Sequence, residues 1–130
     1  MFFNKSKKAK KTALKLLLIW SPAVCGTLGS QMQGAATRNK ILFYLLGSSD
    51  YVCQSAKLGD EDFFSVTKEV LACVGFEEQE VWEALGKFAR QDLTKDEFVH
   101  MMKGADHYQK WVIDNPKAPL FLAMELIGDE

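Results

Sequence analysis

The segment at residues 59–75 constrains the fold most, because its sequence predicts a complete amphipathic helix with signals for both its N-terminus and its C-terminus. Apolar residues recur along it at helical spacing, and polar residues fill the other face. Acids occupy its first turn, where the positive end of the helix dipole stabilises them, and Gly75 suits the left-handed residue that ends many helices. The apolar stripe consists of Phe63, Val66, Val70, Leu71 and Val74. We predict that this helix is central to the fold.

The rest of the chain also has helical patterns. Apolar periodicity predicts a helix from about residue 37 to 57, another at 77–91 and a short last helix at 120–127. Before the last of these, Thr94 and Glu97 form a capping box that starts a further helix. Strand signals are almost absent. We therefore expect an all-α, single-domain bundle of five or six helices.

Two features inside these helices bear on packing. Gly47, Ser48 and Ser49 interrupt one apolar stripe, which indicates either a kink or a close crossing with another helix. The expected core is built from aromatic and large aliphatic side chains. It comprises Phe63, Phe64, Val70, Leu71, Trp82, Leu85, Phe88, Phe98, Met102 and Trp111.

Charge divides the chain into two parts. Residues 1–40 hold eight basic residues and no acid, whereas the other 90 residues carry a net charge of −9. We divide the chain into a basic and then apolar segment at 1–29 and a helical domain at 30–130. The segment at 1–29 is open to three interpretations: a cleaved signal peptide, a short membrane anchor, or a helix that packs on the domain or lies among lipid headgroups. The residues expected to contact a membrane or partner are Lys7, Lys8, Lys10, Lys11, Leu17 and Trp20.

Acids and histidines are the candidate metal ligands. The acids are Asp60, Glu61 and Asp62. Calcium needs many oxygens converging on one point, usually from a loop that alternates ligands, and this cluster has no such alternation. Stabilisation of a helix start explains the same acids without a metal. His100 and His107 are two helical turns apart and opposite Phe98, so we predict that both face solvent and do not share an ion unaided.

No catalytic signature accompanies these residues. The chain lacks a serine-nucleophile motif and a glycine-rich phosphate loop. Its three cysteines form no CxxC pair, which argues against a disulfide scaffold, although Cys53 and Cys73 would remain as a pair if cleavage removed Cys25. The lysine-rich arm lacks interleaved aromatic residues, so nucleic acid is not an expected partner. We predict no catalytic residue, no cofactor and no enzyme.

Residues 38–90 follow a pattern of capped helices joined by acidic turns. Val74, Gly75 and Phe76 form a helix stop. The turn before that helix and the start of the next one contain Gly59, Asp60, Glu61 and Asp62, and then Glu77, Glu78 and Glu80. This order of features resembles the TerB-like helical domains. The resemblance implies an all-helical bacterial scaffold that associates with membrane or stress-response complexes and has no enzymatic activity.

We therefore expect a non-catalytic interaction or scaffold module, cytoplasmic or peripheral to the inner membrane. Its basic segment would hold it to an anionic membrane surface or to a protein partner. Two alternatives come from other classes. One is a small metal-binding protein or metal-dependent hydrolase that uses the acids at 60–62 with His100 or His107. The other is a secreted helical protein left after signal cleavage.

Overall fold

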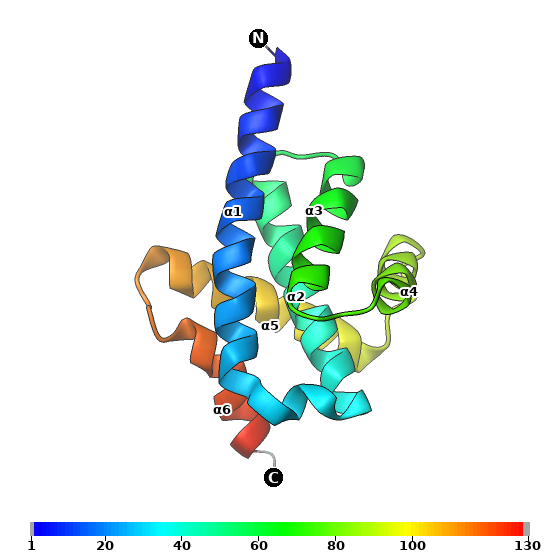
Figure 1. Cartoon of the computed structure of the whole chain (residues 1–130), viewed down its shortest axis with the longest axis vertical. Helices are drawn as coiled ribbons and strands as arrows, with labels where there is room; N and C mark the ends of the chain where they lie inside the picture. The colour runs from blue at the N-terminus through cyan, green and yellow to red at the C-terminus, as the bar shows by residue number, and fades with distance from the viewer. Residues whose placement is uncertain (1, 129–130) are drawn as a thin grey trace.

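The computed structural model describes residues 2–128, and the side chains of residues 7–126. Over this range the chain forms six α-helices and no strand, which confirms the prediction of an all-α bundle (Figure 1). The elements are α1 Phe2–Leu28, η1 Gly29–Gln33, α2 Ala35–Ser55, α3 Asp60–Cys73, α4 Glu78–Ala89, α5 Lys95–Ile113, η2 Ala118–Leu120 and α6 Phe121–Gly128, where η marks a 3-10 turn. α1 runs along the body, and its N-terminal end extends past the other helices (Figure 1).

Helix boundaries lie where local chemistry places them. Thr94 caps α5, because its hydroxyl accepts from the Glu97 backbone N–H at 3.1 Å and the Glu97 carboxylate accepts from the Thr94 N–H at 2.9 Å. Glu77 and Glu80 form the same reciprocal pair at the start of α4. Gly75 takes the left-handed conformation after α3, with φ of 100°. The predicted capping box of α5 and the predicted stop of α3 are therefore confirmed.

The centre of the fold is a close crossing of α2 and α5. A Cβ added to Gly47 would overlap the Met101 carbonyl oxygen. A Cβ added to Gly104 would overlap the Tyr44 carbonyl oxygen. Ser48 lies at the crossing and donates its hydroxyl to the Gly104 carbonyl at 2.9 Å. The interruption in α2 is thus a close helix crossing, because only glycine lets two backbones approach so nearly.

α1 contributes a full stripe to the core. Its buried apolar residues follow steps of three and four, so they share one face of the helix. They are Ala13, Leu17, Trp20, Val24 and Leu28. Trp20 donates its indole N–H to Ser48 at 3.0 Å and packs against Trp111, with ring centroids 5.4 Å apart. The helix therefore belongs to the same core as α2 and α5.

Three residues predicted for the core are on the surface instead. Trp82, Phe98 and Met102 are 53%, 54% and 58% exposed. α5 must turn Gly104 toward α2, and this rotation buries the face that holds Glu97, His100, Met101, His107 and Tyr108. Phe98 and Met102 are consequently on the outer side.

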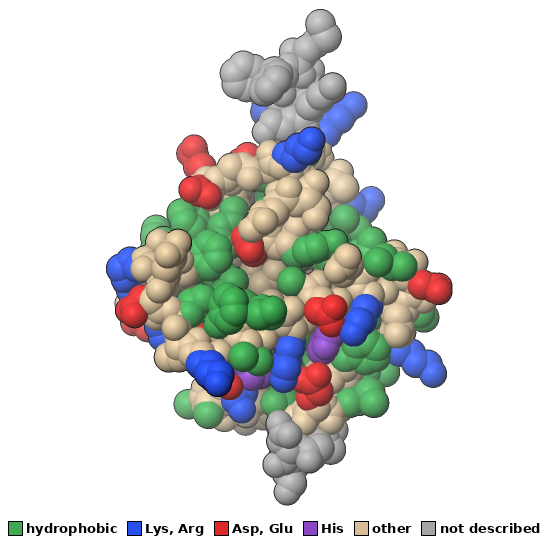
Figure 2. Space-filling model, turned by 180° about the vertical axis from the view of Figure 1, so that it is seen from behind, with side chains coloured by type: hydrophobic (Ala, Val, Ile, Leu, Met, Phe, Trp, Pro, Cys, Tyr) green, Lys and Arg blue, Asp and Glu red, His purple; other side chains and the backbone are tan. Residues whose placement is uncertain are grey.

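Hydrophobic side chains gather over the middle of the face seen from behind (Figure 2).

A buried carboxylate ties three helices together. Glu97 on α5 is 5% exposed, and its oxygens contact the Lys87 ammonium on α4 at 2.7 Å and the Asn39 amide on α2 at 3.0 Å. Burial alone would raise the pKa of this carboxyl. The hydrogen bonds from Asn39, Lys87 and the Thr94 N–H outweigh burial and lower the pKa from 4.5 to about 2.

This network predicts a loss of stability in acid. Because the pKa of Glu97 is lower in the folded chain, its stabilisation is complete above about pH 4.5 and is lost as the pH falls toward 2. We expect Glu97→Gln to lower the free energy of unfolding by about 3 kcal/mol at neutral pH and to flatten the acid dependence below pH 4.5. Urea denaturation between pH 7 and pH 2 measures both effects. Asp92→Asn, at an exposed carboxylate, is the control, and equal curves for the two variants would contradict the assignment.

Candidate functional site

The outer surface of α1 joins a basic end to an uncharged apolar stripe. Lys7, Lys8 and Lys11 are exposed, whereas Lys10 pairs with Asp62 on α3 at 3.5 Å. No charged residue occurs between positions 16 and 28. The outward residues of that stretch are Leu16, which is half-buried, and the exposed Ile19, Pro22, Ala23 and Gly26. A helix with lysines at one end and an exposed apolar face has the chemistry of an interfacial membrane helix.

Leu17 and Trp20 differ from this surface. Both were expected to contact a membrane or a partner, and both are fully buried against the domain. The reason is their position: they lie three residues apart on the face that α1 turns toward α2. Cleavage near residues 24–26 would remove both side chains from the core.

Lys7–Gln33 is long and apolar enough to cross a bilayer, judged by length and composition. Buried core helices and signal sequences meet the same criterion, so it does not separate the three interpretations of the segment. One third of the residues in its most apolar window are buried in the bundle. The packing of α1 corresponds to the third interpretation, a helix that packs on the domain.

The acids predicted as metal ligands are spread around the start of α3. Asp60, Glu61 and Asp62 occupy its first turn. Asp62 is directed to Lys10 on α1, and Glu61 lines a groove on the other side of α3. Among the residues that the structure describes, no group of three or more histidine, cysteine or acidic side chains is placed to hold a metal ion.

The two histidines are buried rather than solvated, so that prediction was wrong. His100 donates from Nδ1 to the Asp96 carbonyl oxygen at 2.9 Å, and His107 Nδ1 lies 2.8 Å from the Tyr44 hydroxyl. The close α2–α5 crossing decides this, because it buries the face of α5 that carries Gly104. Burial lowers the pKa of His107, although Glu125 and Asp106 oppose this effect. Each ring therefore has its own structural partner.

The cysteines are separate thiols. Cys53 is buried, Cys25 is partly buried, Cys73 is exposed, and all three are free. Burial raises the pKa of Cys25 and that of Cys53 to about 11. Such thiols stay protonated at neutral pH and are poor nucleophiles.

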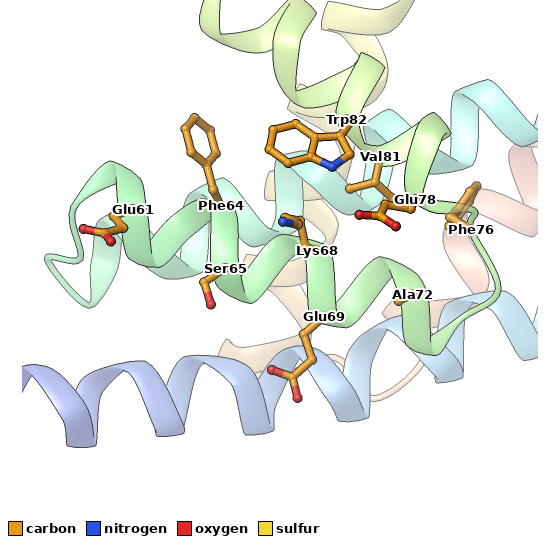
Figure 3. A pocket seen from close by; sticks show the side chains of 10 residues that line it. All are labelled: Glu61, Phe64, Ser65, Lys68, Glu69, Ala72, Phe76, Glu78, Val81 and Trp82. Carbon is orange, nitrogen blue, oxygen red and sulfur yellow. The ribbon is translucent and has the colours of Figure 1, made fainter.

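A groove of about 590 Å³ opens between α3 and α4. Phe64 from α3 and Trp82 from α4 stand beside each other at its mouth, and Val81 lies next to Trp82 (Figure 3). The Lys68 ammonium lies over the Trp82 ring, 4.5 Å from its centroid. The lining residues are Glu61, Phe64, Ser65, Lys68, Glu69, Ala72, Phe76, Glu78, Val81 and Trp82. This surface combines the exposed ring of Trp82 and the partly buried ring of Phe64 with carboxylates.

The groove was not predicted from the sequence, because Trp82 was expected in the core. The buried face of α4 is formed by Val81, Ala84 and Leu85. These residues fit steps of three and four, and Trp82 is one residue, about 100° round the helix, from Val81. A strict reading of the period would have placed Trp82 at the edge of the stripe.

The fold and these surfaces define a class: an all-α helical bundle with surface grooves. Comparison of the chain with protein-family models, curated proteins and solved structures finds no match. The resemblance of residues 38–90 to TerB-like domains therefore stays a prediction.

Proposed function

We propose that this protein is a non-catalytic helical interaction module that attaches to anionic membrane surfaces through α1. The observation that carries the proposal is the outer surface of α1, where exposed lysines precede an uncharged apolar stripe. Lysines near an anionic bilayer contribute about 1 kcal/mol each, and the apolar stripe adds partial insertion among the headgroups. The predicted TerB-like resemblance, with its membrane-associated members, agrees with this role.

The bundle keeps its fold in this mode of attachment. Leu17 and Trp20 stay in the core, and only the outward face of α1 meets the lipid. The contact residues of the proposal are therefore the exposed Lys7, Lys8 and Lys11 together with Ile19. Lys10 is left out because it already pairs with Asp62.

Vesicle sedimentation tests the attachment. We expect the full chain to sediment with phosphatidylserine-containing vesicles and to stay in solution with phosphatidylcholine alone. Changing Lys7, Lys8 and Lys11 together to glutamine should weaken the partition up to roughly 100-fold, because three attractive charges are lost. High salt should weaken wild-type binding in the same direction.

The matched control removes three exposed lysines from other elements, Lys57, Lys95 and Lys117. This triple glutamine variant has the same net charge as the test variant, so it separates a local surface from an effect of total charge. Equal loss in the two variants, or no sedimentation of the wild type with anionic vesicles, would refute the proposal.

A further inference from the structure

We propose that the groove between α3 and α4 binds a basic amphipathic helix of a partner protein. The groove lies apart from the membrane-facing surface assigned to α1, and its lining chemistry differs. It is built from residues of two neighbouring helices, α3 with 14 residues and α4 with 12. Two packed helices of this length form a trough in which a third helix can lie.

The apolar part of the groove offers the anchor site. Trp82 is 53% exposed, and its ring lies beside Phe64 at the mouth (Figure 3). Val81 and Phe76 line the groove and are buried, so they give it a fixed shape, whereas Trp82 is exposed and Phe64 is partly exposed. Exposed tryptophan in such a setting commonly supplies a large share of binding energy once a partner removes it from water.

The charge around the groove selects a basic partner. Three carboxylates line it, from Glu61, Glu69 and Glu78, against one basic side chain, Lys68. Glu61 and Glu78 flank the aromatic pair at opposite ends (Figure 3). A helix with lysine or arginine beside its apolar face would meet these acids, whereas an anionic lipid or a nucleic acid would be repelled.

The same chain is a poorer occupant, although its own N-terminal end is basic. A helix in the groove must bring a large apolar side chain to the Phe64 and Trp82 rings. In α1 the large side chains Leu17 and Trp20 are fully buried in their own domain. Within residues 7–15 the exposed side chains are Lys7, Lys8, Lys11, Thr12 and Lys15, so this described stretch supplies charge without an exposed large apolar anchor.

A designed peptide probes the groove. The probe is a helical peptide of about 15 leucine and lysine residues with every leucine on one face. We expect calorimetric titration of the full chain to give saturable binding. A peptide of the same pattern with glutamate in place of lysine should bind at least roughly 10-fold more weakly, because the acids of the groove repel it.

Two variants report on the two parts of the site. Trp82→Ala should weaken peptide binding by about 30-fold, because it removes the anchor. Glu61→Gln combined with Glu78→Gln should weaken it by about 10-fold at low salt and much less at high salt. Phe98→Ala is the matched control, because Phe98 is an aromatic residue of equal exposure on α5, away from the groove. That variant should bind as the wild type does.

Three outcomes would overturn the inference. Equal affinity of wild type and Trp82→Ala would show that the peptide binds elsewhere, and equal affinity of the two peptides would remove the charge argument. Sedimentation velocity covers the third case. A wild-type dimer that dissociates in Trp82→Ala would make the groove an interface between two copies of this chain. Thermal unfolding of each variant checks that the bundle remains folded.

Discussion

Replacing Gly104 by alanine should unfold the protein or lower its free energy of unfolding by at least about 4 kcal/mol. The new Cβ would overlap the Tyr44 carbonyl oxygen and crowd the Ser48 hydroxyl at 3.1 Å. Backbone atoms have no alternative rotamer, so α2 and α5 would have to separate. Separation would also break the hydrogen bond from Ser48 to the Gly104 carbonyl. Urea denaturation followed by circular dichroism measures the change.

Gly26→Ala is the matched control for this prediction. Gly26 is also inside a helix, but a Cβ there would have no neighbouring atom within 4 Å. Alanine should stabilise α1 by up to about 1 kcal/mol, because it has the higher helix propensity. Similar unfolding curves for Gly104→Ala and Gly26→Ala would contradict the close crossing of α2 and α5.

Replacing Trp20 by alanine should cost about 3–5 kcal/mol, because the side chain is fully buried. The loss has two parts: a cavity beside Trp111 and Tyr108, and the loss of the indole hydrogen bond that the Ser48 oxygen accepts, although the Ser48 hydroxyl still donates to the Gly104 carbonyl. Chemical denaturation gives the difference directly. The effect distinguishes a core helix from an appended anchor or signal, since an appended segment would leave the stability of the bundle unchanged.

The neighbouring residue provides the comparison for Trp20. Ile19 lies one position earlier on the same helix and is 51% exposed. Its replacement by alanine should change the free energy of unfolding by less than about 1 kcal/mol, as surface substitutions usually do. A large loss in Ile19→Ala would mean that the opposite face of α1 is buried, and no loss in Trp20→Ala would mean that α1 is an appended segment outside the core.

Helix positions were accessible to sequence reasoning because their signals are local. The acids before Phe63, the capping box at Thr94 and the glycine at 75 act within a few residues of themselves. The predicted boundaries of α3 and the predicted start of α5 accordingly match the structure closely. The prediction that the apolar stripe of α3 is buried was also correct, since both Val66 and Val70 are buried.

The faces of α4 and α5 were less accessible, because a helix can be rotated by its neighbours. On α5 the apolar residues Phe98 and Met102, one helical turn apart, suggested one buried face. The structure buries the face with Gly104 instead. The His107 ring on that face forms a hydrogen bond with the Tyr44 hydroxyl. Hydrophobicity alone favoured burial of the face with Phe98. The close approach of the α2 and α5 backbones requires the face with Gly104 to be buried instead. The candidate groove on α3 and α4 depends on the same kind of information.

The sequence by itself determined the fold class, the helix starts and stops, and the division of charge between the N-terminal part and the rest. These properties arise from interactions between residues close together along the chain. Only the tertiary structure decided which face of each helix is buried. It placed Trp20 in the core, Trp82 at a groove and His100 out of solvent. These outcomes depend on contacts between residues far apart in the chain, at crossings such as that of Gly47 and Gly104.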